Sequence, residues 1–119
     1  MGCLAEVVGE EMIPITLDKV RHLWFTPNAI ADAEEVMGKN LIAIVTEGGV
    51  RATRALLWAG LKWEDRSLTL EKVGVLMEKW METTPYGELE LKLVEALRAD
   101  GWFKESARQQ QEDKEAAGE

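Results

Sequence analysis

The chain has one histidine, His22, and one cysteine, Cys3, and both residue types can supply a catalytic base or nucleophile. His22 lies in a β-prone run with no nucleophile near it in the sequence, and a histidine base must reach its partner by a hydrogen bond. Cys3 lies near the start of the chain, where a thiolate would lack the fixed base that activates it. Because the chain has a single cysteine, an internal disulfide and a zinc site built from cysteines are both excluded. We therefore expect no catalytic residues and no enzyme activity.

Oxygen-bearing side chains stand at alternate positions from Asp65 to Glu71, faintly like a calcium-binding loop. An EF-hand loop needs a glycine at its sixth position and a glutamate at its twelfth. Counted from Asp65, these positions hold Leu70 and Leu76. The pair Gly48-Gly49 precedes a helical pattern but lacks the Walker sequence that holds phosphate. We expect no metal and no cofactor, and interpret the first segment as a loop with a helix cap and the second as a helix break.

Tryptophan is the most unusual chemical feature, because five of the eight aromatic residues are tryptophans. A small domain rarely buries five indoles completely, and partly exposed tryptophan is typical of binding hot spots. Trp58 and Trp80 lie in strongly apolar helical patterns and are expected in the core, whereas Trp63 and Trp102 lie at expected helix ends beside polar residues. The candidate partner-binding residues are Trp24, Trp63, Trp102 and Phe103.

The composition is that of one small globular domain. The chain has 119 residues, of which 46% are hydrophobic and 30% charged, within the usual range for globular proteins. Its longest apolar run, Ala55 to Leu61, has seven residues, compared with about 20 for a membrane-spanning helix. Residues 1–11 carry three glutamates and no lysine or arginine, unlike a secretory signal. We expect a cytoplasmic protein that does not enter a membrane.

The charge balance disfavours nucleic acid as a partner. Twenty-two acidic and 14 basic residues leave a net charge of −8, and phosphate backbones bind proteins whose basic residues cluster. Arg51 and Arg54, one helical turn apart, form only a small basic spot, which we interpret as a solvated helix face. We therefore expect no nucleic-acid partner.

Two β-prone runs, Met12 to Thr16 and Val20 to Phe25, show the period-two alternation of a β-hairpin. Pro14 cannot donate to a strand ladder, so the first strand lies at an edge or its proline points outward. The second run has apolar residues on both faces, which leaves one face for the core and the other for a partner.

The later segments have apolar residues at helical spacing. Helical patterns cover residues 27–37, 41–45, 50–63, 70–81 and 86–97. Their expected boundary residues are the caps Thr26, Asn40 and Thr69 and the terminating glycines Gly38 and Gly101. The pattern from residue 50 is apolar over so much of its circumference that this helix is either central in a bundle or buried by another subunit, so a homo-oligomer stays open.

These patterns predict a mainly α fold, a small helical domain of about four helices with an N-terminal β-hairpin. We expect the domain to span residues 12–103, between a flexible N-terminal arm, residues 1–11, and a polar, disordered tail, residues 104–119. The tail contains no aliphatic residue larger than alanine, so it has no side chains with which to build a core.

Three stretches follow one another along the chain: ITLDKVRHLWFTPNAIADAEEVMGKNL, RATRALLWAGL and SLTLEKVGVLME. In order and spacing they resemble the small tail assembly chaperones of long-tailed phages, prophages and gene transfer agents, over about residues 13–97. The chain departs from that pattern at the hairpin tip, where Asp18-Lys19 stands in place of the Asp-Gly of similar proteins. None of the three stretches is a catalytic signature.

The resemblance implies a non-catalytic chaperone of tail morphogenesis in the cytoplasm of a bacterial host cell. Its implied client is the tape measure protein, with tail tube subunits as a further candidate. An acidic helical domain with surplus apolar surface can cover the hydrophobic stripe of a helical client.

The alternative is a helix-turn-helix transcription regulator that pairs Val50–Leu61 with Leu70–Met81. Recognition helices usually present basic residues to DNA, whereas residues 71–82 contain two lysines against three glutamates. Charge therefore favours the chaperone over the regulator.

Overall fold

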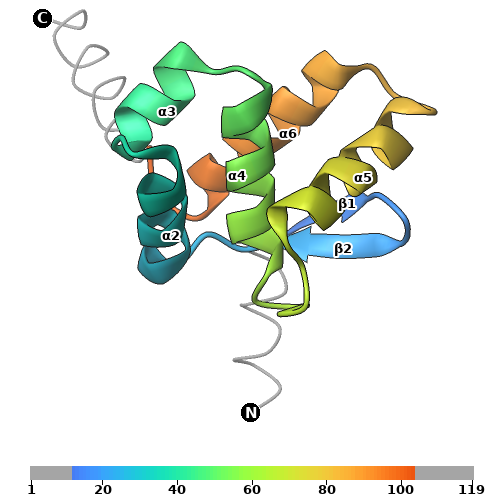
Figure 1. Ribbon diagram of the computed structural model, residues 1–119, viewed down its shortest axis with the longest axis horizontal. Coiled ribbons are helices and arrows are strands. Elements are labelled where there is room, and N and C mark those ends of the chain that lie inside the picture. The colour runs from blue at the N-terminus through green and yellow to red at the C-terminus, as the bar shows by residue number, and fades with distance from the viewer. Residues whose placement is uncertain (1–11, 104–119) are drawn as a thin grey trace, which may run out of the picture.

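The computed structural model describes residues 12–103. The predicted arm, with Cys3, and the predicted tail lie outside the described residues. The chain forms two strands, β1 (Ile13–Thr16) and β2 (Val20–Leu23), followed by a series of helices (Figure 1). The helices are α2 (Pro27–Met37), α3 (Leu41–Glu47), α4 (Val50–Leu61), α5 (Leu70–Met81) and α6 (Tyr86–Ala99).

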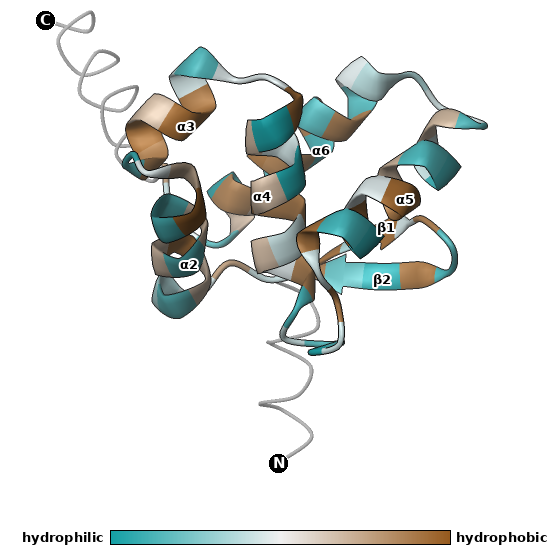
Figure 2. Cartoon of the chain, in the orientation of Figure 1, coloured by the Kyte–Doolittle hydropathy of each residue, from teal (hydrophilic) through white to brown (hydrophobic). Residues whose placement is uncertain are grey.

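This architecture confirms the predicted fold class, mainly α with an N-terminal β-hairpin. Within residues 12–103 there are five helices where about four were expected, because the short α3 is a separate helix. Asn40 caps α3 and Gly48 ends it, so α3 is separated from both of its neighbours. Hydrophobic and hydrophilic residues alternate along the helices in Figure 2, as expected where one side packs and the other meets solvent.

The hairpin pairs its two strands antiparallel, with Ile13 opposite Leu23 and Thr16 opposite Val20. Pro14 is exposed opposite His22, as its missing N–H requires. The side chains that alternate with it, such as Ile15, are buried in the core. One face of the hairpin therefore packs against the helices, with β2 in contact with α4 and β1 in contact with α6.

Local hydrogen bonds explain where the helices begin. The side chains of Thr26, Asn40 and Thr69 accept hydrogen bonds from the backbone N–H three residues later, at 3.1, 2.9 and 3.1 Å. Pro27 occupies the first position of α2, where its missing N–H costs nothing. The caps that the sequence predicts are confirmed because each depends only on residues within one helical turn.

Helix α4 lies at the centre of the domain and contacts α2, α5, α6 and β2 (Figure 1). Leu57 and Leu61 have no exposed surface. Val50, the first residue of α4, lies at the end of the helix remote from Leu61 and is 61% exposed. Packing within the domain covers α4, so its apolar circumference requires no second subunit.

Helix α4 comes close to the chain that leaves β2 at Gly60. A Cβ atom at this position would lie 2.7 Å from Cζ of Phe25 and 3.0 Å from Cδ2 of Leu23. The carbonyl of Gly60 also accepts a 3.0 Å hydrogen bond from the backbone N–H of Trp24. The absence of a side chain therefore lets α4 dock directly on the chain that leaves β2.

Candidate partner-binding groove

The outer edge of β2 is held by the chain that follows α4. The backbone N–H of His22 donates to Oε1 of Glu64 at 3.0 Å, and the carbonyl of His22 accepts from Nε1 of Trp63 at 2.9 Å. Trp24 continues this edge through its bond to Gly60. Helix α4 ends at Leu61, so Trp63 lies in the following turn rather than at the end of a longer helix. Its half-buried indole is part of a clamp on β2.

Trp102 is positioned by the end of α6. Gly101 has a φ of 93°, a left-handed conformation that favours glycine. The N–H of Trp102 then bonds the carbonyl of Leu97 at 3.0 Å, the pattern of a Schellman motif. Nε1 of Trp102 donates to the carbonyl of Phe25 at 2.8 Å. Trp102 and Phe103 are half-buried and pack against the core.

Three indoles gather in a groove of about 570 Å³ between α2, the end of α4 and the loop after it. They belong to Trp24, Trp58 and Trp63, and all three are half-buried. The rings of Trp24 and Trp63 meet edge to face, with centroids 5.4 Å apart and an interplanar angle of 87°. We call this site the indole groove. Its charged lining residues are Asp32, Lys62 and Arg66.

The charges of the indole groove are not balanced. Lys62 lies with its ammonium group 4.5 Å from the centroid of the Trp58 ring and forms an ion pair with Asp32. Burial, followed by the positive charge of Arg66, lowers the pKa of Lys62, while Asp32 favours the charged form. Arg66 is exposed, and none of the ion pairs among residues 12–103 includes it. Two cations and one carboxylate therefore line the groove.

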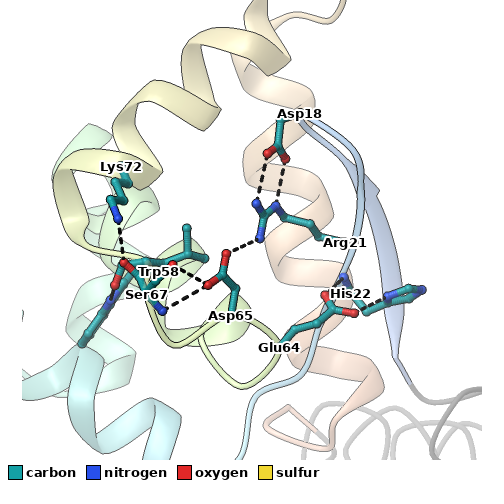
Figure 3. Close-up of polar contacts among 9 residues, drawn as sticks. Asp18, Arg21, His22, Trp58, Glu64, Asp65, Ser67 and Lys72 are labelled. Atoms are coloured by element: carbon teal, nitrogen blue, oxygen red, sulfur yellow. Dashed lines mark hydrogen bonds and ion pairs between the residues drawn. The ribbon is translucent and has the colours of Figure 1, made fainter.

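A buried arginine, Arg21, connects the loop after α4 to the hairpin through hydrogen bonds (Figure 3). Arg21 donates to both carboxylate oxygens of Asp18, at 2.9 and 3.0 Å, and to Asp65 at 3.3 Å. The hydrogen bond from Arg21 lowers the pKa of Asp18. Hydrogen bonds from Ser67, and then from Arg21, lower the pKa of Asp65. In the same loop, the carbonyl of Leu68 accepts a 3.2 Å hydrogen bond from Nε1 of Trp58.

The other sequence candidates have structural partners. Nδ1 of His22 lies 3.0 Å from Oε2 of Glu64 on the surface of the hairpin. The segment from Asp65 is a loop that ends in the cap of α5, as interpreted from the sequence, since Asp65 accepts from Ser67 and Thr69 caps the helix. Among residues 12–103, no group of three or more histidine, cysteine, aspartate or glutamate side chains is arranged to hold a metal ion. The same residues include no helix with the length and apolar character needed to cross a membrane.

The structure brings Trp24 and Trp63 together in the indole groove, and Trp102 and Phe103 are not among its lining residues. The sequence placed Trp58 in the core; in the structure it is partly buried and packs against the core, with its ring beneath Lys62. The spacing of four residues between Trp58 on α4 and Lys62, the residue that caps this helix, was a signal for the contact. Trp80 is buried as expected, with Nε1 bonded to the carbonyl of residue 85 at 3.1 Å.

Aromatic rings with aliphatic neighbours favour burial of an apolar partner, and the cationic rim favours a partner that carries carboxylates. Ala29, Ala59 and Leu68 complete the apolar part of the lining. This arrangement suits recognition of a protein segment by its side chains. The chain matches no protein-family model, and no curated protein or solved structure matches it either.

Proposed function

We propose that this protein is a non-catalytic tail assembly chaperone of the phage, prophage or gene transfer agent type, acting in the cytoplasm of the bacterial host. The observation that carries the proposal is the gathering of three partly buried indoles, Trp24, Trp58 and Trp63, around one groove. Tryptophan is enriched in binding hot spots. The resemblance of residues 13–97 to these chaperones supports the tape measure protein as the proposed client, with tail tube subunits as a further candidate.

The chaperone acts by mass action. Its indole groove covers an apolar stripe on the unassembled client and so holds the client back from aggregation. Growth of the tail tube then removes the client from the free pool, and the chaperone is released without any chemical step. Its net charge of −8 keeps a surface with exposed apolar groups in solution.

The helix-turn-helix alternative finds no specific support in the geometry. Residues 62–69 connect α4 to α5, whereas the turn of that motif has about three or four residues. The connection is also fastened to the hairpin by Arg21 and Asp65. The exposed residues of α5 include Lys72 and Lys79 as well as Glu71 and Glu78, so these four side chains present no net positive charge to a phosphate backbone.

Co-expression with the tape measure protein of the same phage or prophage tests the proposal. The informative variant is Trp24→Ala, because no hydrogen bond within residues 12–103 uses the indole N–H of Trp24 and the fold should survive. We expect wild type to keep the client soluble and to co-purify with it. Trp24→Ala should weaken binding by about 2 kcal/mol, roughly thirtyfold in affinity.

The control is Trp102→Ala, which removes an indole of the same size from outside the groove; unlike Trp24→Ala, it also removes a hydrogen bond to a backbone carbonyl, that of Phe25. Retention of the client by Trp102→Ala, with loss by Trp24→Ala, assigns binding to the groove. Loss with a folded Trp102→Ala would instead extend the binding surface to Trp102 and Phe103. If wild type retains no client, the chaperone proposal is wrong.

A further inference from the structure

We propose that the indole groove binds an acidic amphipathic helix, in which apolar residues contact the three indoles and a carboxylate beside them pairs with Arg66. This inference rests on the proposed function, because it names the chemistry of the client segment that the chaperone holds. The juxtaposition that carries it is Arg66, which has no ion-pair partner among residues 12–103, at the rim of an aromatic groove in a protein of net charge −8.

The form of the partner follows from the backbone around the groove. An extended peptide could bind here by adding a strand to the outer edge of β2. That edge is already occupied, because the N–H and carbonyl of His22 and the N–H of Trp24 bond to Glu64, Trp63 and Gly60. The groove therefore offers side chains rather than backbone groups. A helix, whose backbone groups are satisfied internally, is the partner that such a surface fits.

The charge of the partner follows from the ion pairs of the groove. Asp32 neutralises Lys62, and the aromatic face of Trp58 further stabilises the ammonium group. Arg66 has no such partner among the described residues, so its positive charge is the net charge of the groove lining. Its planar guanidinium can take a carboxylate through two parallel hydrogen bonds. A client carboxylate next to the apolar stripe would neutralise the positive charge of Arg66.

The proposal runs opposite to what the net charge of the protein predicts. A charge of −8 attracts basic peptides at long range, whereas the local charge of the groove favours acidic ones. Phosphate groups would also suit Arg66, but a single unpaired cation in an acidic protein is a poor basis for nucleic-acid binding. Peptide charge therefore separates the local effect from the global one.

The experiment uses three synthetic helical peptides with one common leucine stripe, flanked by glutamate, glutamine or lysine. Binding of each fluorescently labelled peptide to the full chain is measured by anisotropy at low and physiological salt. We expect the glutamate peptide to bind more tightly than the glutamine peptide by about threefold to tenfold, and the lysine peptide to bind most weakly. The preference should shrink as salt is raised.

The decisive variant is Arg66→Glu, an exposed substitution that should leave the fold intact and reverse the order of the peptides. The matched control is Arg51→Glu, which makes the same change of charge at the first turn of α4, the end of the helix remote from the groove. It should leave the order unchanged. An equal effect of both variants would show a response to net charge alone and overturn the proposal.

Three other results would overturn the proposal: tighter binding of the lysine peptide to wild type, no binding of any peptide, or preference for a labelled single-stranded oligonucleotide. Its failure is distinguishable from failure of the chaperone function. If the tape measure protein co-purifies while the glutamate preference is absent, the acidic-helix inference alone is wrong. If the glutamate peptide is preferred while no tape measure protein is retained, the groove chemistry stands and the client is a different acidic helix.

Discussion

Replacing Gly60 with alanine should destabilise the domain, although alanine is the better helix former. The new Cβ would lie 2.7 and 2.9 Å from two ring carbons of Phe25 and 3.0 Å from a methyl group of Leu23. Ordinary carbon contacts lie at about 3.5–4.0 Å. Phe25 and Leu23 are both buried, at 2% and 0% exposure, so neither side chain can turn into solvent to make room.

The expected magnitude is a balance of two terms. Separating α4 from Phe25 by roughly 0.8 Å, the difference between 2.7 Å and a normal contact, is overpacking that costs about 1–3 kcal/mol. Alanine returns up to about 1 kcal/mol of helix propensity. We therefore expect Gly60→Ala to lose about 1–2 kcal/mol of unfolding free energy, with a melting temperature lower by about 4–10 °C.

Gly74→Ala on α5 is the matched control. Its added Cβ meets nothing closer than Cδ of Arg54 at 3.8 Å, so only the propensity term applies and the variant should gain about 0.5–1 kcal/mol. Urea unfolding followed by circular dichroism measures both variants against wild type. Equal stabilisation of the two would refute the direct packing of α4 on the chain that leaves β2.

Three further outcomes concern stability. Leu57→Ala, at a side chain with no exposed surface, should cost about 2–5 kcal/mol in urea unfolding; a loss below about 1 kcal/mol would contradict a core position for α4. Thr69→Ala removes the cap of α5 and should cost about 1 kcal/mol in thermal melts, with Thr69→Asp restoring most of it; unchanged stability would argue against the cap. The lowered pKa values of Asp18 and Asp65 in the folded state mean that their stabilising contribution is complete above the ordinary value of 3.8 and is lost as pH falls below it. Arg21→Met removes the main cause of the lowered pKa of Asp18 but leaves the hydrogen bonds from Ser67 to Asp65, so it should partly flatten the acid limb of a pH titration of stability. A limb as steep as that of wild type would show that Arg21 does not lower the pKa of Asp18.

The sequence alone determined the local features of this protein. The boundaries of the helices follow from Thr26, Gly38, Asn40 and Thr69, since each cap joins atoms within about one helical turn. The hairpin follows from period-two alternation, and the exposed position of Pro14 follows from its missing N–H. Such features depend only on residues that are close together in the sequence, so they can be predicted from the sequence alone.

The tertiary structure decided which side chains meet. Trp58 looked like a core residue in the sequence; it packs against the core but is only partly buried, since it also lines the indole groove beneath Lys62. Arg21 was not singled out, although its place in the alternation of β2 puts it on the same side as Leu23, where it is buried with Asp18 and Asp65.

Trp63 and Trp102 also show which properties only the tertiary structure decides. Trp63 and Trp102 both looked like free indoles at helix ends, yet each donates to a backbone carbonyl far away in the sequence, of His22 and of Phe25. Only Trp63 reaches the groove. Periodicity reports which face of a helix is apolar but not which element covers that face or how completely, because that depends on the packing of segments that are distant in the chain.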